Sequence, residues 1–221
     1  MKYNEKELRD DRKSYIKIYL IGILVGCITR LLDYCSLDTL WSWSSVQTLL
    51  GFWMISNTVI VVKSSSNKCA GISSFLYMFG MTLSFYGLQV ILGMFIPMFS
   101  DGFCFSLFIM FTILSIPCAI AAFALYYWNR DKFYNSILYS LPVGALFSET
   151  VAIAIKFYMT HTFLFQLLMD GIGTIAFGVL FFGRVKNRYV YLFSIIISFL
   201  VFYFILYHRE VLTWLEWNYS I

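Results

Sequence analysis

Two acidic residues, Glu149 and Asp170, lie deep inside apolar sequence. They occupy the two arms of a hydrophobic hairpin over residues 133–182, and the short polar patch 159–161 between the arms predicts the turn. Both acids are a similar number of residues from that turn, so an antiparallel helix pair would hold them at one depth. An ionised side chain at membrane depth is costly and usually has a partner or a function. We therefore expect either a proton relay or substrate-binding group, or a structural link to Arg30 or Lys156.

Asp170 is the centre of a predicted polar stripe. Gln166 and Thr174 are four residues away on either side, so all three share one face of a helix. Gly171 and Gly173 beside the stripe predict the close approach of another backbone. This face is expected to point into a helix bundle.

Other polar residues complete the set of candidate substrate-binding or relay residues. Lys156 is two helical turns after Glu149 and near the predicted outer interface, where its side chain can snorkel. Gln89 is in the third apolar run, and our first interpretation is that its side chain forms hydrogen bonds between helices. Arg30 follows Gly22 and Gly26 on a face suited to tight helix contact, and Asp33 is placed to form an ion pair with it at a helix end.

The composition predicts an all-α integral membrane protein. Hydrophobic residues make up 60% and charged residues 13% of 221 residues, whereas about 25% of the residues of a soluble domain are charged. The apolar runs are about twice the ~10-residue segments of a membrane β-barrel. Seven spans are expected, at 15–32, 46–62, 70–96, 103–128, 133–157, 161–182 and 189–207. The third has an alternative: it could be split or re-entrant near Gly87.

The flanking segments and the charge distribution predict the orientation. Residues 1–14 form a charged N-terminal segment, 15–207 a seven-helix domain, and 208–221 a short interfacial tail. Threading the spans alternately places thirteen of the sixteen lysine and arginine residues on one side. By the positive-inside rule the N-terminus is cytoplasmic and the C-terminus outside. The expected location is the cell membrane, with the lipid bilayer as partner and no nucleic acid.

The common catalytic and cofactor motifs are not found in the sequence. It contains no G-x-S-x-G, H-E-x-x-H, G-x-x-x-x-G-K or C-x-x-C. The five cysteines show no metal-ligand spacing, and no metal or cofactor is expected. Two carboxylates at one depth could form an acid dyad, but their flanking residues do not match intramembrane protease motifs, so an enzyme is the less favoured interpretation.

Four segments together resemble a known family. They are Gly26-Cys27-Ile28-Thr29-Arg30-Leu31-Leu32-Asp33, Thr48-Leu49-Leu50-Gly51-Phe52-Trp53, Phe79-Gly80-Met81-Thr82 through Tyr86, and Leu141-Pro142-Val143-Gly144-Ala145 leading to Glu149. The chain resembles a family of small bacterial polytopic membrane proteins known only as a domain of unknown function. The resemblance implies a membrane helix bundle and no particular activity.

Three functions are compatible with these observations. The first is a small-solute transporter or substrate-capturing membrane subunit that uses the intramembrane acids, driven by a proton gradient or by an energising partner subunit. The second is a non-enzymatic accessory or assembly protein that binds another membrane protein. The third is an intramembrane hydrolase using Glu149 and Asp170.

Overall fold

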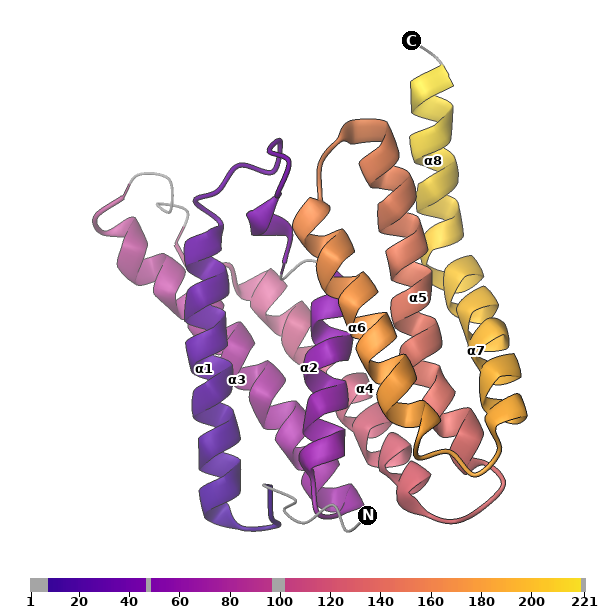
Figure 1. Cartoon of the computed structure of the whole chain (residues 1–221). Helices are drawn as coiled ribbons and strands as arrows, with labels where there is room; N and C mark the ends of the chain where they lie inside the picture. Colours follow the sequence, from indigo (N-terminus) through magenta and orange to yellow (C-terminus); the bar gives the residue numbers. More distant parts are fainter. Residues whose placement is uncertain (1–7, 47–48, 97–101, 220–221) are drawn as a thin grey trace. The chain divides into compact units, whose positions relative to one another are not determined.

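The described part of the chain is helical. A computed structural model describes residues 8–46, 49–96 and 102–219, and of residues 214–219 only the backbone. Its α-helices are α1 (Arg12–Leu32), α2 (Leu50–Lys63), α3 (Asn67–Gly93), α4 (Phe105–Leu125), α5 (Asn135–Thr160), α6 (Leu164–Phe182), α7 (Arg188–Phe202) and α8 (His208–Tyr219) (Figure 1). The all-α prediction is confirmed.

Six of the predicted spans correspond to helices that are long and apolar enough to cross a membrane. These are α1, α3, α4 with the 3-10 turn that follows it, α5, α6, and α7 continued into α8. The second expected span, 46–62, is represented by α2, which has 14 residues. At 1.5 Å per residue α2 is about 21 Å long, whereas the hydrocarbon core is about 30 Å thick. The third span is one continuous helix through Gly87, so the alternative of a split span is wrong.

The segments at both ends of the chain are described in part. Of the predicted charged segment 1–14, residues 1–7 lie outside the described residues. Asp11 caps α1 by accepting a hydrogen bond from the Ser14 N–H at 2.9 Å. At the other end the helix does not stop at Tyr207 but passes through a π-helical turn, Tyr203–Tyr207, directly into α8. Residues 220–221 of the predicted tail lie outside the described residues.

The chain divides into two compact units. The first comprises Met1–Tyr34 and Asn57–Tyr126, and in it α3 packs against both α1 and α4. A Cβ atom on Gly22 would overlap the Tyr77 carbonyl oxygen, and one on Gly26 would overlap that of Met81. The predicted tight helix contact along Gly22 and Gly26 is therefore present.

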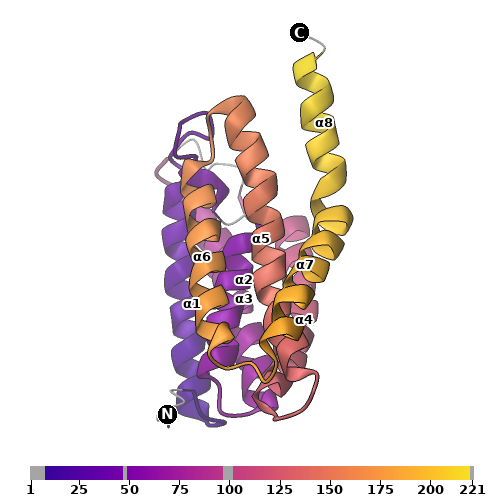
Figure 2. The same ribbon diagram turned by 45° about the vertical axis from the view of Figure 1, so that its right-hand side comes forward.

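The second unit comprises Cys35–Ser56 and Tyr127–Ile221, and α5 is its central helix. Two views show α5 lying between α6 and α7 (Figures 1 and 2). A Cβ atom on Gly144 would overlap Cβ of Ser198 and lie 2.9 Å from the Phe199 nitrogen, so α5 and α7 are in close backbone contact. Near the other face of α5, the rings of Trp128 and Tyr139 stack at 4.8 Å.

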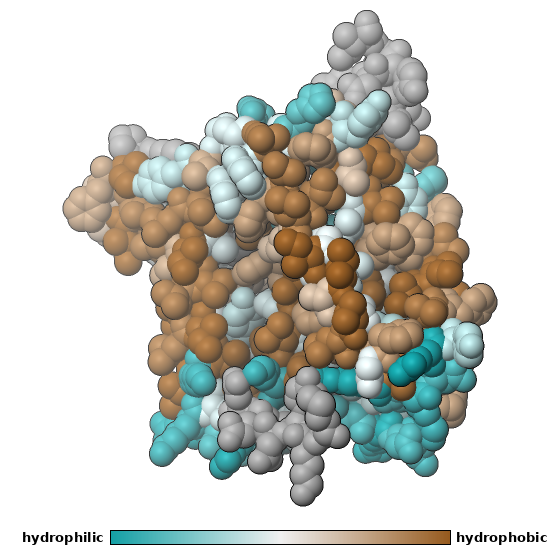
Figure 3. Space-filling view, in the orientation of Figure 1, coloured by the Kyte–Doolittle hydropathy of each residue, from teal (hydrophilic) through white to brown (hydrophobic). Residues whose placement is uncertain are grey.

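The helices expose large apolar side chains along their lengths. Exposed residues include Leu24 on α1, Ile113 on α4, Ile175 on α6 and Ile197 on α7. On the face shown in Figure 3, hydrophobic residues cover the middle of the helices and hydrophilic residues gather at their ends. A soluble monomer rarely exposes apolar patches of this extent. The helices and their surface together indicate a multi-pass membrane protein.

Candidate functional site

The second unit brings the two predicted acids together in its interior. Glu149 is on α5, Asp170 is on α6, and both are 0% exposed. The turn between these helices is residues 161–163, slightly later than predicted. Asp170 is consequently closer to the turn along the chain than Glu149 is. Their carboxyl groups nevertheless lie within electrostatic range of each other.

A loop before α2 holds the start of α6 in place. Ser42 is buried, and its hydroxyl donates to the Leu37 and Thr39 carbonyls at 2.6 and 2.9 Å. The same hydroxyl accepts a hydrogen bond from the Phe163 N–H at 3.0 Å, and the Leu164 N–H donates to the Leu40 carbonyl at 2.9 Å. These bonds satisfy backbone groups at the α6 N-terminus that the helix itself leaves without partners. They fix the position of the helix that carries Asp170.

The predicted polar stripe on α6 is present. The Gln166 amide nitrogen donates to both Asp170 oxygens, at 3.0 and 2.9 Å. Farther along, the Thr174 hydroxyl lies 3.4 Å from that of Thr150 on α5. The Gln166 carbonyl oxygen is buried and has no hydrogen-bond partner among the described residues. The side-chain carbonyl oxygen of Gln166 is therefore a buried hydrogen-bond acceptor of the stripe that is not used.

The first turn of α2 lies directly against Asp170. A Cβ atom on Gly51 would overlap Asp170 Oδ1 and lie 2.6 Å from Cγ. A side chain at position 51 would require the Asp170 carboxyl group or α2 to move, and the sequence did not reveal this contact. The expectation of close backbone approach at Gly171 and Gly173 is wrong. A Cβ on Gly171 would be 3.8 Å from Thr150 Cγ2, an ordinary contact, and one on Gly173 would meet the Ile55 side chain at 2.9 Å.

Glu149 faces hydrogen-bond donors from α2 and from Tyr207. The backbone N–H groups of Leu50 and Gly51, and the Tyr207 hydroxyl, lie beside its carboxyl group. Both Glu149 oxygens are buried. The N–H groups at the start of a helix carry partial positive charge. The carboxyl group of Glu149 therefore lies at the positive end of α2.

Tyr207 is a site residue that sequence reasoning missed. It is buried at the end of the π-helical turn, and its hydroxyl lies beside the Glu149 carboxyl group. A π-helical turn adds a residue to the helical repeat and is often found at functional sites. No residue type in 203–207 marks the turn in advance. The turn is what directs this phenol toward Glu149.

The remaining predicted site residues occupy other surroundings. The Lys156 ammonium group is 3.7 Å from the centroid of the Phe163 ring. Arg30 belongs to the first unit and forms a 2.9 Å ion pair with Asp33, which confirms the predicted pair. Burial raises the pKa of Asp33, and the Arg30 charge lowers it in part. Gln89 is a buried residue of α3 in the first unit.

The arrangement in the second unit is suited to binding a proton. It contains the two buried carboxyl groups, the buried Gln166 side-chain carbonyl oxygen and the buried Tyr207 hydroxyl. The described residues contain no group of three His, Cys, Asp or Glu side chains suited to a metal ion. The available groups can accept, donate and exchange a proton. We refer to Gly51, Glu149, Gln166, Asp170 and Tyr207 as the carboxyl site.

Comparisons with protein-family models, curated proteins and solved structures find no match. The resemblance to a bacterial membrane family of unknown function thus stays an expectation. The class of protein is defined by the helices: a multi-pass membrane protein with two carboxyl groups buried in one of its units.

Proposed function

We propose that the protein is a proton-coupled transporter, or a substrate-capturing membrane subunit, in which Glu149 and Asp170 bind and release a proton during transport of a small solute. The observation that carries the proposal is the burial of both carboxyl groups in one unit, within electrostatic range of each other and at the start of α2.

The energetics support an exchangeable proton. Two negative charges within electrostatic range in an apolar interior repel each other and lose their hydration. A bound proton removes one of the charges, and the positive end of α2 offers a compensating charge when the proton leaves. The site therefore has a means of stabilising a protonated and a deprotonated state.

The short α2 fits this class of protein. In many secondary transporters, interrupted helices place their termini at a buried ion or substrate site, and α2 begins at the carboxyl site. We propose further that α2 and the segment before it complete a seventh crossing. The N-terminus is then cytoplasmic and the C-terminus outside, with the protein in the cell membrane, in accordance with the positive-inside count.

The test is solute-driven proton movement in proteoliposomes that contain a pH-sensitive dye. Amino acids, sugars, nucleosides and vitamins are added one at a time under an imposed potassium diffusion potential. Wild-type protein is expected to move protons with at least one solute, and Glu149→Gln to abolish that movement. Asp131→Asn, which changes an acid of the same unit whose side chain is 86% exposed, is the matched control.

Melting temperatures in detergent separate a functional role from a structural one. Functional acids are commonly held at a cost to stability, so Glu149→Gln and Asp170→Asn are expected to raise the melting temperature. A fall of several degrees with no solute-driven proton movement would contradict the proposal. Stoichiometric co-purification of another membrane protein would then favour the accessory role, and cleavage of a membrane reporter the hydrolase.

A further inference from the structure

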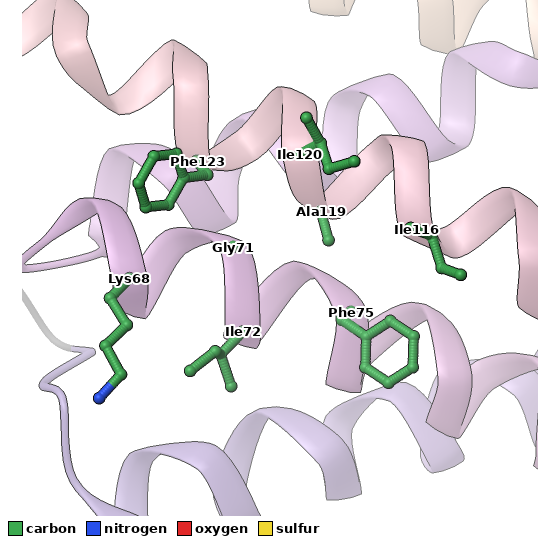
Figure 4. A pocket seen from close by; sticks show the side chains of 8 residues that line it. All are labelled: Lys68, Gly71, Ile72, Phe75, Ile116, Ala119, Ile120 and Phe123. Atoms are coloured by element: carbon green, nitrogen blue, oxygen red, sulfur yellow. The ribbon is translucent and has the colours of Figure 1, made fainter.

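An apolar groove lies between α3 and α4 in the first unit, away from the carboxyl site in sequence. Its volume is about 310 Å³. Figure 4 shows the lining residues, among them Ile72 and Phe75 on α3 and Ile116 and Ile120 on α4. Both isoleucines of α4 are exposed. The proposed function does not use this groove.

Small residues make the groove possible. Gly71 and Ala119 lie between the larger side chains (Figure 4). A Cβ atom on Gly71 would be 3.2 Å from the Ala119 carbonyl oxygen and 3.3 Å from Cβ of Phe123, so the two helices are in close contact there. The flanking side chains stand above this contact and form the walls.

The lining suits a hydrocarbon chain. The lining residues span eight positions on α3 and eight on α4, and seven steps along a helix measure about 10 Å. All of the lining residues except Lys68 are apolar. A segment of one acyl chain of that length can lie against this surface.

One end of the groove carries a positive charge. Lys68 is the one charged residue that lines it, and its side chain is 69% exposed. The Asn67 side-chain amide donates to the Phe123 carbonyl at 3.0 Å at this same end. The Lys68 ammonium group is 3.8 Å from Asp10, an exposed pair of the kind that contributes little to stability. Lys68 can therefore turn to another anion at little cost.

We propose that the groove binds one acyl chain of an anionic phospholipid, with Lys68 contacting the phosphate of its headgroup. An apolar channel that ends in a single ammonium group matches the two parts of such a lipid. Basic residues next to a membrane helix attract anionic lipids.

The experiment measures binding of single lipids to the full-length protein in mild detergent by native mass spectrometry. Phosphatidylglycerol and phosphatidylcholine with identical chains are compared. Phosphatidylglycerol is expected to bind roughly fivefold more tightly, the effect of one basic residue near a membrane surface. Lys68→Gln should remove that preference, and Ala119→Phe, which fills the groove, should weaken binding of both lipids. Asp10→Asn should strengthen phosphatidylglycerol binding.

Two variants serve as matched controls. Lys17→Gln removes an exposed charge from α1, and Ala121→Phe adds a ring to an exposed position of α4 outside the groove. Both should bind as the wild type does. Equal affinity for the two lipids, or a lipid preference that survives Lys68→Gln, would overturn the proposal. Lys68 is exposed, so this variant keeps the fold even if Ala119→Phe does not.

Discussion

Replacing Gly51 with alanine tests whether the start of α2 is held against Asp170. The added Cβ would overlap Asp170 Oδ1 and lie 2.6 Å from Cγ and 2.9 Å from Oδ2. The carboxyl group must then move away from the Gln166 amide that holds both its oxygens, or α2 must shift. Either adjustment makes the folded state less stable.

The size of the effect follows from three contributions. Overpacking a buried contact costs about 1–3 kcal/mol, and lost hydrogen bonds to a charged group cost about 1.5–3 kcal/mol. Alanine recovers up to about 1 kcal/mol through its higher helix propensity. Together these give a net loss of about 1.5–6 kcal/mol, which corresponds to a fall in melting temperature of roughly 3–24 °C for a chain of this length.

The melting temperature of Gly51→Ala in detergent is compared with that of an alanine variant of Gly171, the glycine next to Asp170 in the sequence. Gly171→Ala adds the same methyl group beside Asp170, but its closest contact would be 3.8 Å from Thr150 Cγ2. This control should leave stability unchanged or raise it. In an Asp170→Ala background, Gly51→Ala should lose most of its cost because the clash is gone. An equal effect of Gly51→Ala and Gly171→Ala, or a cost unchanged by Asp170→Ala, would refute the assigned contact.

Two further predictions concern the loop before α2 and the end of α1. Ser42→Ala should destabilise the protein by about 1–3 kcal/mol because it breaks the bonds to Leu37, Thr39 and Phe163. Ser44→Ala, whose hydroxyl has no partner among the described residues, should cost much less; thermal melts of the two variants provide the comparison. Burial raises the pKa of Asp33 in the folded state. The contribution of Asp33 to stability is therefore full below its ordinary pKa, and it is lost as the pH rises through the raised pKa. Asp33→Asn should remove that part of the fall in melting temperature above about pH 4, and an unchanged pH profile would contradict the assigned burial of Asp33.

Local patterns in the sequence were sufficient for the helices and for part of the site. Apolar run length predicted seven spans, and six of them are helices long enough to cross a membrane, since an α-helix satisfies its own backbone groups in lipid. Spacing of four residues predicted the Gln166–Asp170 pair, because both positions share one helix face. Spacing of three predicted the pair of Arg30 with Asp33 for the same reason.

The rest of the site depends on contacts between distant parts of the chain. Gly51 lies in the apolar stretch 49–55, and its role is set by Asp170, a residue on another helix. Tyr207 ends an uninterrupted hydrophobic run, so no breaker residue marked the π-helical turn. The start of α2 was predicted at Val46, but the chain first forms a 3-10 turn at Trp43–Ser45 and the helix begins at Leu50. Tertiary contacts, not local propensity, determined these three features.

The length of α2 also has a consequence for how the protein is made. A 14-residue apolar helix is too short to be retained as a spanning segment by its hydrophobicity alone. Its partners Glu149 and Asp170 are synthesised about a hundred residues later, which at cellular translation rates is a delay of roughly 5–20 s. During that interval α2 must remain at the insertion machinery without yet being inserted as a spanning helix. Nascent chains stalled before α5 should therefore leave this segment accessible to water-soluble labelling reagents.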